Sequence, residues 1–66
     1  MNIKLKFISH ETTWDKVITD ENDNIIQQDL GMELTEFNNT KDYFDGWENQ
    51  IRNFPNYNVI EVERFI

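Results

Sequence analysis

The sequence predicts an α+β domain with the element order β-β-β-α-β, in which one amphipathic helix packs on one face of a four-stranded mixed sheet. Three patterns lead to this prediction: alternating apolar residues at the start of the chain, a turn-rich acidic segment between two β-branched runs, and one stretch with helical periodicity. With 66 residues, the chain forms a single domain over residues 1–66. Such a short chain buries only roughly 60% of the surface that its unfolded form exposes.

The first predicted element is a strand at residues 2–8 (NIKLKFI). Its apolar residues are Ile3, Leu5 and Phe7, and the lysines between them are Lys4 and Lys6. Alternation with a period of two places the apolar side chains on one face of a sheet and the lysines on the other.

Residues 14–19 (WDKVIT) and 24–30 (NIIQQDL) are predicted to pair as a hairpin around the turn-rich DEND. If Thr19 pairs with Asn24, apolar side chains lie on both faces of this hairpin. Ile18 and Ile25 then share one face, and Val17 and Ile26 share the other.

A short helix starting near Thr12 is the competing interpretation of the first of these two segments. Trp14, Val17 and Ile18 have the i, i+3, i+4 spacing of a helix face. Two β-branched residues in succession favour the strand.

The segment MELTEF at residues 32–37 stays open between helix and strand. Leu34 and Phe37 suit a helical turn, whereas Met32, Leu34 and Glu36 suit alternation.

The segment between Asn39 and Pro55 predicts the helix. Asn39 or Thr40 caps its start, and Pro55 ends it. The apolar residues on one face are Phe44, Trp47, Ile51 and Phe54, and the polar residues opposite are Asp42, Asp45 and Asn49.

The final segment, residues 59–66 (VIEVERFI), is predicted as a strand. One face carries Ile60, Val62 and Ile66, and the other carries Glu61, Glu63 and Phe65. A right-handed crossover from the helix places this strand parallel to the first one. A single helix covers only one face of such a sheet, so the apolar residues on the second face indicate a partner or a homodimer there. The alternative explanation is a slightly different register of the strands.

The charge of the chain is strongly negative, with 13 acidic and 6 basic residues and a net charge of −7. Residues 15–36 hold seven acids against Lys16 alone. This balance disfavours direct binding to nucleic acid or to an anionic membrane. The absence of cysteine fits a reducing compartment, and no segment is long and apolar enough for a signal peptide or a membrane span. We therefore expect a cytoplasmic protein.

Two apparent motifs fail the requirements of their chemistry. DENDNI begins like a calcium loop, but Ile25 and Gly31 occupy the places where that loop needs glycine and a bidentate glutamate. HETTW at His10 lacks the second histidine of a zinc-protease motif. Glu61 and Glu63 are a pair of carboxylates, but acid-base catalysis needs an enclosing cleft, which a chain of this size rarely builds. We expect no enzymatic activity, no cofactor and no metal site.

The acids are instead predicted to bind a positively charged partner. Carboxylates two residues apart on a strand are separated by roughly 6.8 Å, a spacing comparable to that of successive phosphates along one strand of DNA. The predicted partner-binding residues are Asp15, Asp20, Glu21, Asp23, Asp29, Glu61 and Glu63. The five acids between residues 15 and 29 are expected to line a strand and its turn as one phosphate-like row.

The segment VITDENDNIIQQDLGMELTEF, an acidic hairpin followed by L-T-E-F, resembles the small acidic proteins with which bacteriophages inhibit host uracil-DNA glycosylase or nucleoid proteins as DNA mimics. The resemblance implies a protein that binds and blocks a basic, nucleic-acid-binding surface of a host protein. The alternative is a small structural or regulatory interaction module, for example a homodimer, whose charge serves solubility. A minor third interpretation, nucleic-acid binding through Phe7, Trp14 and the two lysines of the first strand, is opposed by the net charge.

Overall fold

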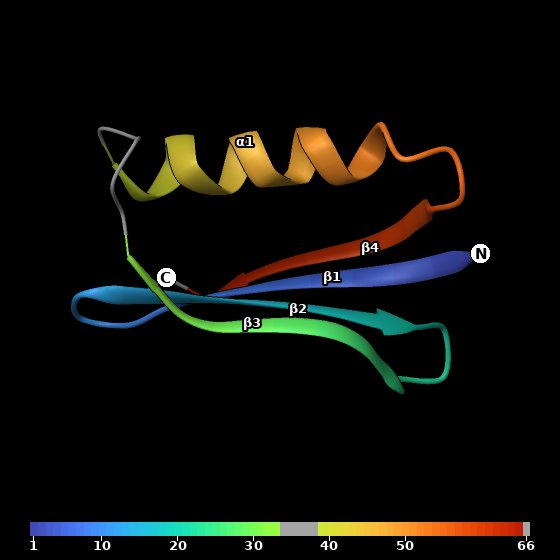
Figure 1. The fold of residues 1–66 in the computed structure, drawn as a ribbon, viewed down its shortest axis with the longest axis horizontal. Coiled ribbons are helices and arrows are strands. Elements are labelled where there is room, and N and C mark those ends of the chain that lie inside the picture. The colour runs from blue at the N-terminus through green and yellow to red at the C-terminus, as the bar shows by residue number, and fades with distance from the viewer. Residues whose placement is uncertain (34–38, 66) are drawn as a thin grey trace.

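The computed structural model describes residues 1–33 and 39–65 and confirms the predicted order β-β-β-α-β (Figure 1). The elements are β1 (Asn2–Ser9), β2 (Thr13–Asp20), β3 (Ile25–Glu33), α1 (Thr40–Arg52) and β4 (Asn58–Phe65). Of the segment whose structure the sequence left open, Met32 and Glu33 end β3, and residues 34–37 lie outside the described residues. Residues 14–19, for which a helix was the competing interpretation, lie in the strand β2.

The four strands form one mixed sheet in the order β3-β2-β1-β4. β1 pairs with β2 and β2 with β3 in antiparallel fashion, and the crossover through α1 places β4 parallel to β1. The helix α1 lies along one face of this sheet, and none of the described segments covers the opposite face (Figure 1). We call these two surfaces the helix face and the open face.

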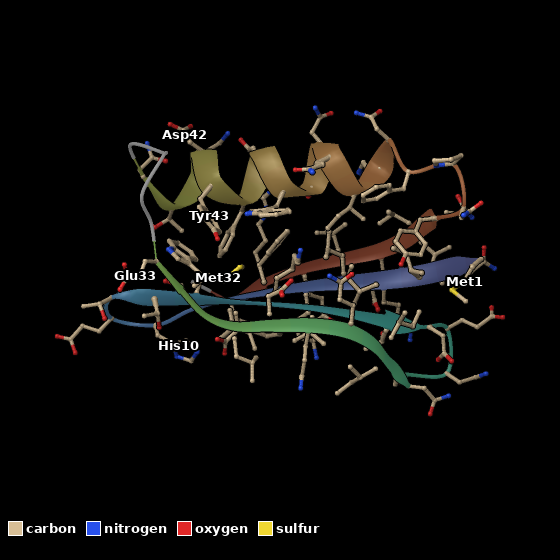
Figure 2. All side chains as sticks on the ribbon, viewed as in Figure 1. Met1, His10, Met32, Glu33, Asp42 and Tyr43 are labelled. Carbon is tan, nitrogen blue, oxygen red and sulfur yellow. The ribbon has the colours of Figure 1, made fainter. Side chains whose placement is uncertain are left out.

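The core lies between α1 and the helix face, where alternate residues of β1 and β2 meet the helix. Its buried members are Ile3, Leu5, Phe7, Trp14, Ile18, Tyr43, Phe44 and Ile51. The Phe44 ring stacks on Phe7 with centroids 4.6 Å apart and meets the Trp14 ring edge-on at 4.4 Å. Tyr43 points from α1 toward Met32 on the sheet (Figure 2), and its hydroxyl lies 3.4 Å from the Met32 sulfur.

The start of α1 matches the prediction, but its end does not. Asn39 is the N-cap, and its Oδ1 accepts the backbone N–H of Asp42 at 2.9 Å. The last helical residue is Arg52, so Phe54 lies beyond the helix and does not extend its apolar face. Phe54 is 48% exposed and packs edge-on against Tyr57. Tyr43 was not among the predicted apolar residues of the helix, but it is buried in the core.

The predicted hairpin register is wrong at its tip. Thr19 pairs with Ile25 and not with Asn24, because a register shift after Ile18 leaves Ile26 as an extra residue in β3. Ile25 consequently shares the open face with Val17 rather than the helix face with Ile18.

A register shift between β1 and β4 makes the faces of β4 differ from the predicted ones. The pairing with β1 shifts at Ile60, so Val59 and Val62 are the β4 residues that pack against the core. Ile60, which alternation placed on the same face as Val62, is 47% exposed. Glu61 and Glu63 lie on the opposite face from Val62, as predicted. Ile66 lies outside the described residues.

Candidate partner-binding surface

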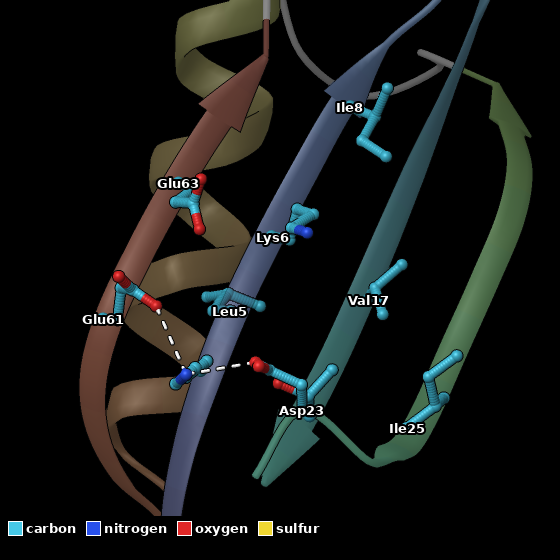
Figure 3. A pocket seen from close by; sticks show the side chains of 10 residues that line it. Leu5, Lys6, Ile8, Val17, Asp23, Ile25, Glu61 and Glu63 are labelled. Carbon is cyan, nitrogen blue, oxygen red and sulfur yellow. Dashed lines mark hydrogen bonds and ion pairs between the residues drawn. The ribbon is translucent and has the colours of Figure 1, made fainter. Parts of the chain in front are cut away.

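The open face is built by the residues that alternate with the core positions of each strand. Residues that pair across strands share a face, so the lysines of β1 lie beside the glutamates of β4. Side chains that line an open hollow of about 570 Å³ on this face include Lys4, Lys6, Ile8, Val17, Thr19, Asp23, Ile25, Glu61 and Glu63 (Figure 3).

The charged half of the open face lies over β4 and β1. Glu61 pairs in register with Lys4, and Glu63 pairs with Lys6. Lys4 Nζ lies 3.0 Å from Asp23 Oδ1 and 3.9 Å from Glu61 Oε2, as the dashed lines in Figure 3 show. The hydrogen bond to Asp23 holds the pKa of Lys4 above its ordinary value.

Glu63 and Lys6 are less constrained than this cluster. Lys6 Nζ lies 5.7 Å from the centroid of the Phe65 ring, which is within the range of a cation–π contact. Within the described part of the chain, Glu63 accepts no hydrogen bond and forms no ion pair, so its carboxylate is available to an incoming cation.

The apolar part of the open face runs from β1 across β2 to β3. Ile8, Val17 and Ile25 come from three neighbouring strands, and Figure 3 shows them as a diagonal line across the sheet. We call these three residues the apolar row. Ile25 is 61% exposed, which is high for a residue of this size and hydrophobicity.

The structure brings three of the seven predicted acids together on the open face. Asp23 and Glu61 lie beside Lys4, and together with Glu63 they line the hollow. Glu21 is exposed in the turn between β2 and β3, where its carboxylate lies 3.5 Å from the side-chain amide of Asn2.

Asp15 lies on the open face but is held by contacts within the chain. Its Oδ1 accepts the backbone N–H of Gly31 at 3.0 Å, and its Oδ2 lies 2.6 Å from His10 Nε2. The hydrogen bond with His10, together with that from Gly31, holds the pKa of Asp15 below its ordinary value. His10 lies on the side of the sheet opposite Tyr43 (Figure 2). Asp15 thereby fixes the irregular end of β3, where Gly31 has a φ of 67°.

Asp20 organises the turn between β2 and β3. Its carboxylate accepts the backbone N–H groups of Asn22 and Asn24 at 2.8 and 3.0 Å, and the side-chain amide of Asn24 at 3.0 Å. The hydrogen bonds from Asn24 lower the pKa of Asp20. These contacts give Asp20 a structural role in this turn.

Asp29 lies on the helix face, away from Asp15 and from the three acids that line the hollow. Its Oδ2 lies 3.1 Å from Nζ of Lys16, which is only 4% exposed. The same Lys16 Nζ lies 3.9 Å from the centroid of the Trp47 ring. Since Asp15 and Asp29 occupy opposite faces, the five acids between residues 15 and 29 do not form one row.

Sequence reasoning did not predict the surroundings of three lysines, two on β1 and one on β2. It placed Lys4 and Lys6 on the polar side of a strand and weighed them for nucleic-acid binding, but it did not predict that parallel pairing of β1 and β4 brings them beside Glu61 and Glu63. It also left Lys16 unassigned, although alternation between Trp14 and Ile18 already turns this lysine toward the core. Both signals were present in the period-two pattern.

The open face combines charged and apolar side chains around its hollow. The described residues contain no group of three or more His, Cys, Asp or Glu side chains that could hold a metal ion. In residues 1–33 and 39–65, no helix has the length and hydropathy needed to cross a membrane. Charged side chains flank the apolar row on this face.

No protein-family model, curated protein or solved structure matches this chain.

Proposed function

We propose that this chain is a non-enzymatic protein that binds, through its open face, a basic surface of another protein and blocks the access of nucleic acid to it. One observation carries the proposal. Asp23, Glu61 and Glu63 gather on a sheet face that no described element covers, beside exposed apolar side chains. A negative surface of this kind attracts and orients a positive partner.

The spacing of the β4 glutamates supports competition with nucleic acid. Glu61 and Glu63 are two residues apart on one strand, so their side chains leave the sheet at positions roughly 6.8 Å apart. A basic groove that accepts successive phosphates can accept these two carboxylates in their place. The likeness of the acidic hairpin to bacteriophage DNA mimics points in the same direction.

The two lysines of the open face limit how far mimicry alone can account for binding. Three acids, Asp23, Glu61 and Glu63, stand against Lys4 and Lys6, which leaves a local excess of one negative charge. The apolar row must therefore supply part of the affinity, while the acids supply attraction and orientation.

A second candidate function is an assembly module in which the open face binds a structural partner through apolar contacts. It is favoured by the exposure of Ile25 and Phe65, at 61% and 46%. In this case the glutamates serve solubility and do not contribute to recognition.

Affinity capture distinguishes the two functions. The wild-type protein and a Glu61→Gln/Glu63→Gln variant are immobilised, and a bacterial lysate is passed over each with and without added duplex DNA. We expect the wild type to retain a basic protein that DNA displaces and that the variant retains poorly. Retention by both proteins that is unaffected by DNA would contradict the proposal and support the assembly module.

A further inference from the structure

We infer that the partner element seated on the open face is a basic amphipathic helix, which lies along the apolar row and directs cationic side chains to the acids around it. The inference rests on the proposed function and names the class of partner. Its first support is the shape of the row, which runs obliquely from Ile8 on β1 through Val17 on β2 to Ile25 on β3.

The length of the apolar row fits a short helix. Ile8 is opposite Asp15, two residues before Val17, and Ile25 is opposite Thr19, two residues after Val17. The row therefore spans four residues along the strands and two strand spacings across them, a distance of about 17 Å. Three turns of helix cover about 16 Å, so apolar residues spaced along one helix face can reach all three side chains.

Backbone hydrogen bonding favours a helix over an extended segment. The open face presents side chains, because the backbone groups of β1 and β2 are already paired with strands on both sides. An extended segment lying on this face would leave its own N–H and C=O groups without partners, whereas a helix satisfies them internally. The other face of the same sheet already carries a helix, and a helix on each face is a stable layered arrangement.

The charges around the apolar row select a basic helix. Asp23 lies near the Ile25 end, and Glu61 and Glu63 form the outer flank beyond the lysines. Lys4 is already bound by Asp23 and Glu61, so it repels an incoming cation less than a free lysine does. Long basic side chains can rest their apolar stems on the sheet and place their charges at the glutamates.

A second copy of this chain fits the open face less well. A face-to-face dimer with its two-fold axis across the strands places β4 over β4, and the glutamates of the two copies oppose each other. With the axis along the strands, β4 lies over β3, and Glu61 and Glu63 oppose the apolar residues of the second copy. The first arrangement sets like charges together, and the second removes charges from water without a partner.

A pair of synthetic peptides tests the inference without a known partner. The first is a helical peptide of about 14 residues with leucines along one face and lysines along its flanks. The second has the same composition in an order that scatters the leucines. Amide chemical shifts of the isotope-labelled protein are followed during titration with each peptide, and sedimentation reports whether the free protein associates with itself.

We expect the amphipathic peptide to shift the amides of Ile8, Val17 and Ile25 and to bind more tightly than the scrambled peptide. The variant Val17→Thr/Ile25→Thr keeps two β-branched side chains, which suit a strand. It should weaken binding of the peptide about tenfold, because two apolar contacts are lost. The matched control, Phe54→Ser, removes an exposed apolar side chain that does not line the hollow and should leave binding unchanged.

Each contrary result has a distinct meaning. Equal binding of the two peptides, shifts confined to the acidic turn, or absence of binding would overturn the helix inference while leaving capture of a DNA-displaceable partner intact. Binding that depends on Val17 and Ile25 but not on Glu61 and Glu63 would overturn the basic helix and the proposed function together. Self-association that the Val17→Thr/Ile25→Thr variant abolishes would assign the face to a second copy.

Discussion

The two faces of the sheet carry similar side chains in different surroundings. On the helix face, Lys16 is buried against Trp47 and paired with Asp29. On the open face, Lys4 forms a comparable pair with Asp23, but the side chain of Asp23 is 76% exposed. The covering helix therefore determines whether a charge pair is buried in the fold or exposed at the surface.

Arg64 on β4 extends this contrast at the margin of the helix face. Its guanidinium lies 2.8 Å from Asp45 and 3.1 Å from Glu48, both on α1, and 5.6 Å from the centroid of the Phe44 ring. These contacts join β4 to the helix. The neighbouring Glu63, which points to the other face, makes no such contact among the described residues.

The largest expected difference between the faces comes from apolar truncation. Phe44→Ala removes a fully buried ring that contacts Phe7 and Trp14, and should cost about 3–5 kcal/mol in the free energy of unfolding. Ile25→Ala on the open face should change that free energy by less than about 0.5 kcal/mol. Urea denaturation followed by circular dichroism measures both. Similar losses for the two variants would mean that the open face belongs to the core.

Neutralising the aspartate that pairs with each lysine should give a smaller difference in stability between the two faces. Asp29→Asn leaves the ammonium of Lys16 buried without its counter-charge and should destabilise the fold by about 1–3 kcal/mol. Asp23→Asn leaves the partly exposed Lys4 near Glu61, and asparagine tolerates the positive φ of 67° at this position. We expect little change for that variant in the same denaturation experiment. An Asp29→Asn protein as stable as wild type would show that Lys16 does not need the carboxylate.

The dependence of stability on pH should distinguish Asp20, which accepts the hydrogen bonds of the turn, from the neighbouring Glu21, which does not. The lowered pKa of Asp20 means that its ionised form is favoured by folding. The resulting stabilisation is complete above the ordinary pKa of 3.8 and is lost as the pH falls through the lower pKa of the folded state. Asp20→Asn should therefore be less stable than wild type at neutral pH, and its stability should fall less on acidification.

The control for this titration is Glu21→Gln, which removes the adjacent charge without removing the hydrogen bonds of the turn. Its acid profile should follow that of the wild type. Identical profiles for Asp20→Asn and wild type would contradict a structural role for Asp20.

The sequence predicted the order of elements because local patterns determine them. Alternation in β1, the turn residues before β3 and the helical spacing of Phe44, Trp47 and Ile51 are all visible in short windows. The extra residues Ile26 and Ile60, and the further register shift between Trp14 and Lys16, were not predictable, because a bulge depends on how two strands fit together. As a result, Ile25 does not share the face of Ile18, and Ile60 is 47% exposed.

The candidate surface was predictable in part for the same reason. The alternation of Glu61 and Glu63 against Val62 was sufficient to place both carboxylates on the open face. The sequence did not divide the hairpin acids by role, because Asp15 and Asp29 acquire partners across the strands, whereas Asp20 is bound within its own turn. Their charge is visible in the sequence, whereas their hydrogen bonds are not.

The smallest expected effect on stability belongs to the two glutamates of β4. Glu61→Gln/Glu63→Gln keeps side-chain size and hydrogen-bonding capacity, and Lys4 retains its hydrogen bond to Asp23. The free energy of unfolding should change by less than about 0.5 kcal/mol, as for other exposed positions. Thermal or urea denaturation checks this, and substantial destabilisation would assign these carboxylates to the fold.

Competition with DNA, measured with this same variant, tests the central claim most directly. The basic protein captured by the wild type is bound to labelled duplex DNA, and the release of DNA is followed as the wild type or the variant is added at low and at high salt. We predict that the wild type displaces DNA efficiently at low salt and poorly at high salt, because screening weakens contacts between exposed charges. The folded variant should compete weakly at both. Equal competition by the two proteins would contradict the account, because the glutamates of the open face would then play no part in binding.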